Sequence, residues 1–449
     1  MPCGAAAPAA RSREGVGVRV LVVGGGAREH ALCWRLARED GVHVWAAPGN
    51  PGMRSVARCV PVAADDAAAL ADVARREGVD LVVVGPEGPL VDGVADALRP
   101  QGLAVLGPGA AAARIEGSKR WAMAFCRRHG IPAPAFEVAE DVPRALELAA
   151  RWPLPVVCKA DGLMAGKGVV VAETRDEALA AARLLAARGP VVFEEFLAGV
   201  ELSAFALCDG QRVWYLGEAR DHKRLLDGDR GPMTGGMGAF APVPELDEAT
   251  RTQVRGILRA AVAALAAEGV PFVGFLFAGL MLTAAGPRVL EFNCRLGDPE
   301  AQALLPLLAG PIAEHWLVAA RGGLPGDGDA PRAPEAALGV VLASPGYPEA
   351  PRAGGRIQGL CSDGGVHGAL CFHAATALRD GEWTTTGGRV LTVVGRGSDL
   401  ATARSAAYRA AASVQFAARQ WRGDIGLPPG GGREGSGLPD PSESGGRRL

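Results

Sequence analysis

Three polar residues near position 290 are spaced to share one face of a strand. Side chains alternate along a strand, so Glu291, Asn293 and Arg295 would point the same way. A carboxylate and an amide oxygen are hard ligands of the kind that Mg²⁺ binds, and a guanidinium pairs with phosphate oxygens. The spacing therefore indicates magnesium and phosphate chemistry, with a solvated edge strand as the alternative. The other face would carry Leu290, Phe292 and Cys294.

Two lysines flank a glycine-rich tip between residues 154 and 171. Lys159 ends an apolar run and alternates with Cys158, so its side chain can face inward. Gly166-Lys167-Gly168 follows, and a second apolar run begins at Val169. The pattern predicts a hairpin whose lysines suit a polyphosphate, and its spacing is not that of a P-loop.

The next polar segments suit a nucleotide and an anion. A strand over 191–193 leads into Glu194-Glu195-Phe196-Leu197, whose backbone could hold adenine, and Glu201 could hold ribose hydroxyls. Asp221-His222-Lys223-Arg224 is a cluster of ionic groups, and the glycine loop over 229–238 has backbone amides that could cradle an anion. Each segment alone could be a turn or a surface ion pair.

The elements that must position these residues begin with strands over 18–23, 42–46 and 80–84. A helical pattern over 29–38 separates the first two, and such alternation predicts a parallel sheet. Three loops follow the strands, at the edge where open parallel sheets bind ligands. They are Gly24–Glu29, Gly49–Gly52 and Gly85–Pro89. The first departs from a dinucleotide fingerprint at Glu29, and a dehydrogenase interpretation would rest on that loop alone.

Composition bounds the remaining possibilities. A chain of 449 residues, 49% of them hydrophobic, suggests about three domains. The net charge of −2 argues against a general nucleic-acid binder, and no apolar run is long enough for a membrane span. The nine cysteines are odd in number and occur singly, without a Cys-x-x-Cys pair, which indicates reduced thiols in a reducing compartment. We therefore expect a cytoplasmic protein. Residues 1–17 are expected to be a disordered extension, with an organelle-targeting peptide as the alternative, and 427–449 a disordered tail.

In this order the motifs closely resemble those of the glycinamide ribonucleotide synthetases (phosphoribosylamine–glycine ligases), which are ATP-grasp enzymes. The resemblance runs from about residue 18 to 425. It rests on these segments: 24–31, 48–52, 116–119, 159–163, 166–169, 194–197, 221–224, 291–300, Thr386-Gly387-Gly388-Arg389-Val390-Leu391 and 422–425.

The resemblance implies a multidomain α/β and α+β fold. A Rossmann-like pre-ATP-grasp domain would span 18–118. The ATP-grasp core would comprise 119–138 and 207–332, with a lid inserted over 139–206. A C-terminal α/β domain would span 333–426.

The resemblance also implies roles for individual residues. Glu291 and Asn293 would bind Mg²⁺ or Mn²⁺. ATP would contact Lys119, Lys159, Lys167, Gly168, Glu194, Glu195, Phe196, Leu197 and Glu201. The catalytic residues would be Lys159, Asp221, Lys223 and Arg295. The other substrates would lie near Gly26, Asn50, Gly52, Glu87, Thr234, Gly235, Gly236 and Asp298.

The implied reaction uses ATP, glycine and 5-phosphoribosylamine. Glycine would attack the γ-phosphate to give glycyl phosphate, and the amine would then displace phosphate to give glycinamide ribonucleotide. Such chemistry needs positioning and charge neutralisation, with a closing lid to exclude water, and it needs no side-chain nucleophile. No nucleic-acid or membrane partner is expected, and the enzyme would be a monomer.

Three positions depart from the family pattern, namely Met233, Phe277 and Thr386. Met233 replaces an asparagine, and a thioether cannot replace the donor and acceptor of an amide. Two alternatives therefore stay open. One is another ATP-grasp ligase, such as a carboxylase-type purine enzyme, and the other is an ATP-binding homologue with impaired catalysis.

Overall fold

The computed structural model describes residues 17–164 and 168–427. The expected disordered termini lie outside the described residues, except for Gly17 and Leu427, and so do Gly166 and Lys167. None of the described helices has both the length and the apolar composition needed to cross a membrane.

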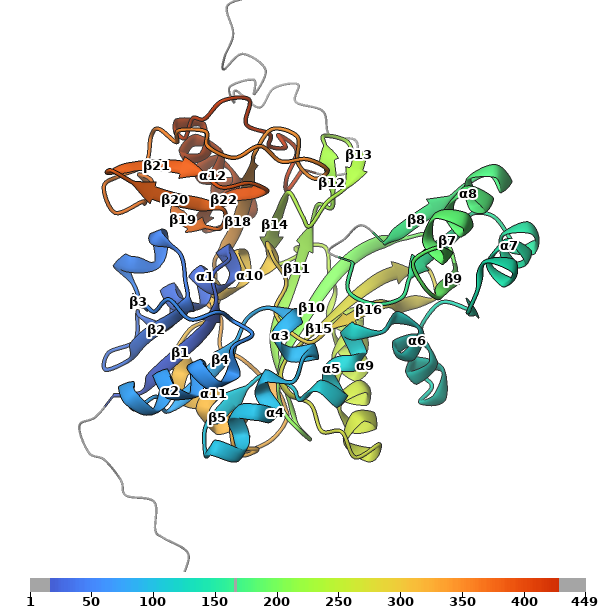
Figure 1. Cartoon of the computed structure of the whole chain (residues 1–449), viewed down its shortest axis with the longest axis horizontal. Helices are drawn as coiled ribbons and strands as arrows, with labels where there is room; N and C mark the ends of the chain where they lie inside the picture. Colours follow the sequence, from blue (N-terminus) through green and yellow to red (C-terminus); the bar gives the residue numbers. More distant parts are fainter. Residues whose placement is uncertain (1–16, 165–167, 428–449) are drawn as a thin grey trace, which may run out of the picture.

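Residues 19–106 form a five-stranded parallel sheet with its helices, drawn in blue to cyan in Figure 1. Its order is β3-β2-β1-β4-β5, and β1 pairs in parallel with both of its neighbours, β2 and β4. The sequence predicted this alternation correctly. The strands are β1 (Arg19–Gly24), β2 (His43–Pro48), β3 (Arg58–Cys59), β4 (Leu81–Val84) and β5 (Ala104–Leu106). The helices are α1 (Ala27–Leu36), α2 (Ala67–Glu77), α3 (Glu87–Val91), α4 (Val94–Leu98) and α5 (Ala110–Gly117), with short 3₁₀ turns η1 (Pro51–Ser55) and η2 (Arg99–Gln101).

A nine-stranded sheet forms the centre of the molecule, with the path β16-β15-β10-β11-β14-β18-β22-β19 and β17 beside β11. Its first part comprises β10 (Val200–Asp209), β11 (Val213–Asp221), β14 (Gly238–Ala241), β15 (Val273–Thr283), β16 (Gly286–Asn293) and β17 (Gly328–Asp329). Helix α9 (Glu248–Ala267) is the longest helix beside it. The segment after β16 forms α10 (Glu300–Leu304), η3 (Leu305–Leu307) and α11 (Ile312–Ala320).

The C-terminal region extends this same sheet. Strand β18 (Ala336–Ala343) pairs with β14, and β22 (Arg389–Gly397) and β19 (Leu370–His373) follow it. Two hairpins lie outside the large sheet: β12–β13 (Arg224–Leu226 with Arg230–Met233) and β20–β21 (Thr376–Arg379 with Glu382–Thr385). Helix α12 (Leu400–Ser413) packs on β22 and β18. The C-terminal region and the central region thus share one hydrogen-bonded sheet.

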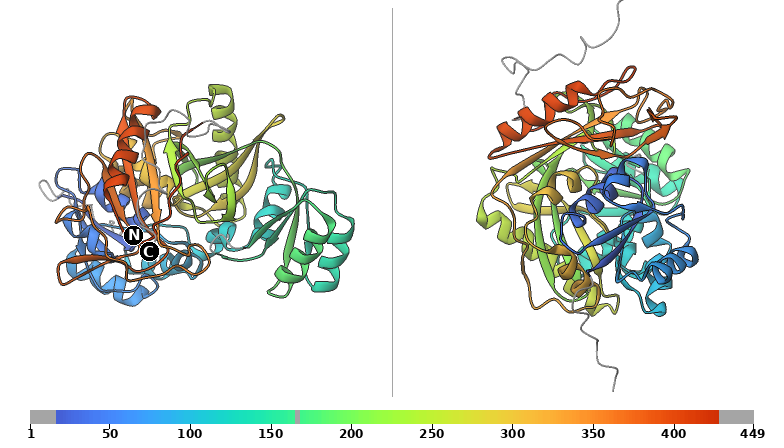
Figure 2. Two further views of the ribbon diagram at one scale, coloured as in Figure 1. Left: turned by 90° about the horizontal axis from the view of Figure 1, so that it is seen from above. Right: turned by 90° about the vertical axis from the view of Figure 1, so that its left-hand side faces the viewer.

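A smaller four-stranded sheet projects from the rest of the molecule, as the left view in Figure 2 shows. It has the order β6-β9-β7-β8 and is covered by α7 (Val142–Arg151) and α8 (Arg175–Ala186). The strands are β6 (Phe136–Ala139), β7 (Val156–Ala160), β8 (Val169–Ala172) and β9 (Val191–Glu195). We call residues 136–195 the lid sheet. Strands β7 and β8 form the antiparallel hairpin that the sequence predicted.

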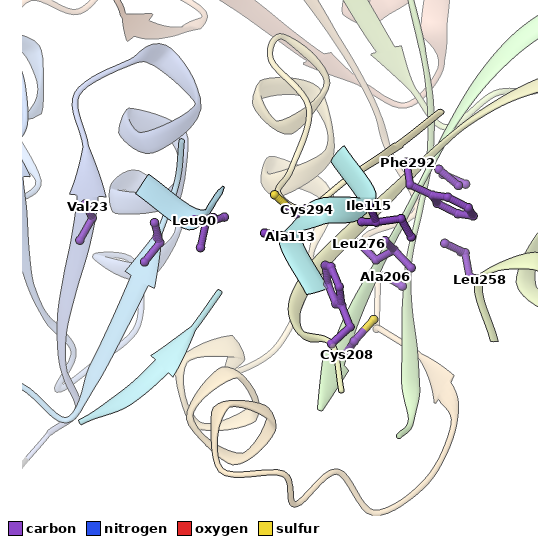
Figure 3. Close-up of a cluster of buried hydrophobic side chains, with 14 of the residues drawn as sticks. Val23, Leu90, Ala113, Ile115, Ala206, Cys208, Leu258, Leu276, Phe292 and Cys294 are labelled. Atoms are coloured by element: carbon purple, nitrogen blue, oxygen red, sulfur yellow. The ribbon is translucent and has the colours of Figure 1, made fainter. Parts of the chain in front are cut away.

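One buried apolar cluster joins the first sheet to the central one. In Figure 3 it runs from Val23 and Leu90 through Ile115 of α5 to Leu276 and Phe292. Helix α6 (Lys119–Arg128) starts next to α5, and its first turn is capped by Ser118, whose hydroxyl accepts from the amide of Trp121. Continuous packing of this kind fixes the N-terminal loops relative to β16.

Candidate active site

Strand β16 has a bulge at Leu290, just before its polar residues. Glu291 pairs with Gly279, and Val289 pairs with Leu280, so Leu290 is the extra residue. A bulge resets the alternation of side chains. The expectation that Leu290 joins Phe292 in the core is therefore wrong, and Val289 takes that place. Downstream of the bulge, Glu291 and Asn293 share a face as predicted, and Cys294 is in the core on the other.

Three lysines surround the Glu291 carboxylate. Burial disfavours its charge, but Lys223, Lys159 and Lys119 outweigh burial and lower the pKa of Glu291. Lys159 reaches this place from β7, where its ammonium donates to the carbonyl of Leu290 at 2.9 Å. The ammonium of Lys119 donates to the Gly162 carbonyl at 2.8 Å, and burial lowers its pKa. An ionised carboxylate among one buried and two half-buried ammonium groups is suited to a metal–polyphosphate complex.

Lys159 also forms a buried ion pair with Glu194 of β9, with 2.8 Å between the charged atoms. Burial raises the pKa of Glu194 despite this lysine. Its second oxygen, Oε1, is buried and has no hydrogen-bond partner among the described residues. Further along the same segment, Phe196 is 41% exposed and Leu197 is buried. The side chain of Glu195 turns away to accept from the Ala135 amide and to pair with Arg288.

A group of acids lies around Lys223. The ammonium of Lys223 is 2.9 Å from Glu201. Burial raises the pKa of Asp221 to about 8; Lys223 opposes this shift, whereas Glu300, Glu201 and Glu291 add to it. Glu300 is buried and accepts a hydrogen bond from Ser203 at 3.0 Å. Glu300 lies in the motif over 291–300, but the sequence predicts no role for it, because only the fold brings it next to Asp221.

A chain of ion pairs connects the first loop of the N-terminal sheet to β16. Arg28 contacts Glu29 at 2.6 Å and Glu87 at 3.8 Å. Glu87 in turn contacts Arg295 at 3.2 Å, and Arg295 contacts Glu116 at 2.8 Å. Although burial disfavours the charge of Glu87, Arg295 and Arg28 lower its pKa to about 2. Arg28 and Glu116 were not among the predicted site residues, since neither role is visible before α1 and α5 are placed beside β16.

The three N-terminal loops converge as expected. The amide of Gly49 donates to the Gly24 carbonyl, and the amide of Gly26 donates to Glu29 at 2.7 Å. The side chain of Asn50 makes three hydrogen bonds within the protein: it donates to the carbonyls of Gly25 and His373, and it accepts from the amide of Gly52. Asn50 therefore shapes this part of the site through its neighbours.

The glycine loop over 234–236 lies against the segment that follows β16. The hydroxyl of Thr234 donates to the Lys223 carbonyl and accepts from the Gly236 amide at 3.0 Å. Asp298 receives a hydrogen bond from Gln302 at 2.7 Å. Burial disfavours the charge of Asp298, but Arg389 and Arg28 lower its pKa.

The polar face of β16 fits a divalent ion that is bound mainly through substrate. Among the described residues, no group of three or more His, Cys, Asp and Glu side chains is placed to hold a metal. The protein oxygens on this face of the strand are those of the Glu291 carboxylate and the Asn293 amide. The amide nitrogen of Asn293 is buried without a partner among these residues. Mg²⁺ typically uses one or two protein oxygens together with substrate phosphates and water, so these two side chains are consistent with such an ion.

Comparison with known proteins assigns the chain to a family. Three models match in sequence order: the N domain of phosphoribosylglycinamide synthetase over residues 18–116, its ATP-grasp (A) domain over 117–301 and its C domain over 337–428. The chain belongs to the phosphoribosylglycinamide synthetase family. The resemblance noted in the sequence is thereby confirmed.

Relatives match along nearly their whole length. The phosphoribosylamine–glycine ligase of Ralstonia nicotianae is 46% identical, covering 91% of this chain and 99% of the relative. That of Caulobacter vibrioides is 45% identical, covering 91% and 97%. A crystal structure of the Thermotoga maritima phosphoribosylamine–glycine ligase is 37% identical with a TM-score of 0.78, covering 91% of this chain and 100% of that one.

More distant structures share the fold alone. The biotin carboxylase domain of a Hydrogenobacter thermophilus 2-oxoglutarate carboxylase has a TM-score of 0.68 at 18% identity, covering 91% of this chain and 92% of that one. These likenesses confirm the predicted ATP-grasp architecture with its Rossmann-like first sheet.

Proposed function

We propose that this protein joins glycine to 5-phosphoribosylamine with ATP, giving glycinamide ribonucleotide, ADP and phosphate, in purine biosynthesis. The observation that carries the proposal is the placement of Lys119, Lys159 and Lys223 around Glu291, next to the N-terminal loops. The relatives that match over their whole length are named for this ligase activity. We also propose that the protein works as a monomer in the cytoplasm.

The first step transfers a phosphoryl group from ATP to the carboxylate of glycine. Lys119 and Lys159, together with Lys167 and Gly168 of the expected hairpin tip, hold the ATP phosphates. The backbone of Glu194 to Leu197 holds adenine, and Glu201 holds ribose. Glu291 and Asn293 hold Mg²⁺ or Mn²⁺, which neutralises charge on the phosphate oxygens when bound. Catalysis of this kind is mainly positioning and electrostatic stabilisation.

The second step is attack by the amine on the acyl phosphate. Gly26, Gly52 and Glu87 lie along the N-terminal loops, where the sugar phosphate binds. Arg295 forms ion pairs with both Glu87 and Glu116. These pairs hold its guanidinium between the N-terminal loops and strand β16. Asp221 and Glu300 lie together among buried charges and can bind the ammonium group of glycine. The loop over Thr234–Gly236 and the carboxylate of Asp298 complete the substrate site.

The test is phosphate release measured with glycine, phosphoribosylamine and ATP, each omitted in turn. We expect sustained release only when all three are present, with glycinamide ribonucleotide formed in equal amount. Phosphate release that needs a different amine or carboxylate would favour another ATP-grasp ligase. ATP binding without any glycine-dependent turnover would favour the impaired homologue.

A further inference from the structure

The C-terminal region reaches two loops of the candidate site through the ends of two neighbouring strands. His373 ends β19 and Arg389 begins β22, and the two strands are paired, with His373 opposite Leu391. The His373 carbonyl accepts from Asn50 of the N-terminal sheet at 2.8 Å. Arg389 instead points to the ATP-grasp side. None of the roles proposed above falls on the C-terminal region.

Arg389 binds two segments of the substrate site at once. Its Nη1 donates to the carbonyl of Gly235 and to the carbonyl of Asp298, each at 2.6 Å. The same nitrogen is 3.4 Å from the Gly236 carbonyl, and Nη2 is 3.4 Å from the Asp298 carboxylate. One guanidinium thus ties the glycine loop to the segment after β16, and hydrogen bonds from a charged group are stronger than neutral ones.

The two tied segments are in close contact with each other. Gly236 has φ of +109°, and a Cβ added there would lie 2.4 Å from the Pro299 side chain. A second residue of the C-terminal region, Tyr347, accepts from the Gly235 amide at 3.0 Å. The spacing between the glycine loop and Asp298 is therefore set both by this direct packing and by contacts from Arg389 and Tyr347 of the C-terminal region.

This spacing matters because Asp298 also faces the first loop of the N-terminal sheet. A Cβ added at Gly26 would lie 3.9 Å from a carboxylate oxygen of Asp298. A shift of Asp298 would thus change the space next to Gly26, where the proposed sugar phosphate binds. The nucleotide segment over 194–201 is contacted by Lys159, Lys223 and Arg288 instead.

We propose that Arg389 is a positioning residue for glycine and phosphoribosylamine: it holds the Gly235–Gly236 loop and Asp298 at the spacing that these two substrates need, and it leaves ATP binding unaffected. The inference rests on the proposed function. It deepens that function, because it gives the C-terminal region a defined part in selecting the two non-nucleotide substrates.

The chain offers a matched control on the same strand. Arg396 lies at the far end of β22 and pairs with Glu335 at 2.7 Å. Replacing either arginine by methionine removes one guanidinium and its ion pair from β22. Only Arg389→Met removes contacts to the site. If weakening β22 were itself enough to change the substrate constants, Arg396→Met would change them too.

The experiment compares wild type, Arg389→Met, Arg389→Lys and Arg396→Met as full chains. Apparent KM values for glycine, phosphoribosylamine and ATP are measured with kcat, and ATP and glycinamide ribonucleotide binding are measured by calorimetry. We expect Arg389→Met to raise the KM for glycine or for the amine, and the Kd for glycinamide ribonucleotide, about tenfold or more. The ATP constants should stay within about twofold, lysine should restore part of the loss, and Arg396→Met should resemble wild type.

Other outcomes overturn the inference. If all substrate constants of Arg389→Met are unchanged, or if those of ATP rise equally, Arg389 is only a structural contact. If the methionine variant does not fold, Arg389→Lys takes its place, because lysine keeps the charge and loses the planar, two-nitrogen guanidinium. Arg389→Lys must then raise the KM for glycine or for the amine and leave the KM for ATP unchanged. If none of these KM values changes, the role is refuted. Inactive wild-type protein would instead contradict the proposed function, and glycinamide ribonucleotide binding would still test Arg389.

Discussion

Among individual residues, Glu291 combines a partly buried carboxylate with three lysines that keep it ionised. Its face on β16 was predictable from alternation with Asn293, and so was the inward direction of Lys159. The bulge at Leu290 was not, because a bulge depends on the partner strand β15 and not on β16 itself. The Lys159–Glu194 pair likewise requires β7 and β9 to be neighbours, which no local pattern encodes.

Replacing Glu291 by glutamine should lower kcat at least about 100-fold, because a fixed charge is removed while the size is kept. Steady-state assays at saturating Mg²⁺ measure the effect. The matched control is Glu382→Gln, which removes a carboxylate from an exposed ion pair with Arg356 in the β20–β21 hairpin. Near-normal turnover of the Glu291 variant would exclude the proposed metal role.

Glu87 should make the stability of the protein depend on pH. Its folded-state pKa of about 2 lies below the usual value of 4.5, so its contribution is complete above about pH 4.5 and is lost as pH falls toward 2. Glu87→Gln should destabilise the protein by about 1–3 kcal/mol at pH 7, since Arg295 and Arg28 lose a partner. Urea unfolding between pH 7 and pH 3 should show the two free energies of unfolding converging as pH falls. A constant difference would contradict the assigned cause.

Among the elements, the β12–β13 hairpin and its glycine loop are held from the C-terminal segment. Arg422 donates to the Arg224 carbonyl at 3.1 Å and pairs with Asp229 at 2.7 Å. The sequence predicted a glycine loop over 229–238; this is wrong for Arg230–Met233, which form the strand β13 paired with β12, and only the residues between Met233 and Gly238 form the loop. The sequence did not predict that distant residues such as Tyr347 would occupy one of the loop amides, because that contact joins segments more than a hundred residues apart.

Met233 ends this hairpin opposite Arg224, so its backbone is held independently of its side chain. We therefore expect the natural chain to be active, and Met233→Asn to lower the glycine KM about tenfold by restoring an amide contact. Glycine titrations at saturating ATP measure the change, with Met233→Leu as a control that adds no polar group. A natural chain without glycine-dependent turnover, made active by asparagine, would instead support the impaired-homologue alternative.

In the whole molecule, the C-terminal region completes the central sheet. The sequence motifs indicate a C-terminal domain that begins at residue 333. Its first long strand, β18, is hydrogen-bonded to β14 of the central region, so the two regions share one sheet. This pairing joins residues about a hundred positions apart, so only the folded chain reveals it. The parallel order of the first sheet was predictable because its strands and helices alternate locally.

A chain that ends at residue 335 should aggregate, because it leaves the edge of β14 unpaired along with its apolar neighbours. Expression followed by size-exclusion chromatography measures the outcome, with a chain ending at Leu427 as the control. A soluble, monomeric truncated chain would show that β14 does not need β18.

The lid sheet leaves and rejoins the molecule through strands that are hydrogen-bonded neighbours, since Phe136 of β6 lies opposite Glu194 of β9. The two ends of this sixty-residue segment therefore lie side by side, while contacts such as the hydrogen bond from Lys159 to the Leu290 carbonyl hold its middle against the rest of the molecule. A segment of this kind can be exchanged between related ligases, or replaced by a short connector, without changing the order or pairing of the strands in the nine-stranded sheet. Chimaeric enzymes that carry a relative's residues 136–195 should therefore fold, and the exchange would leave the proposed adenine and ribose contacts at Phe196, Leu197 and Glu201 in place.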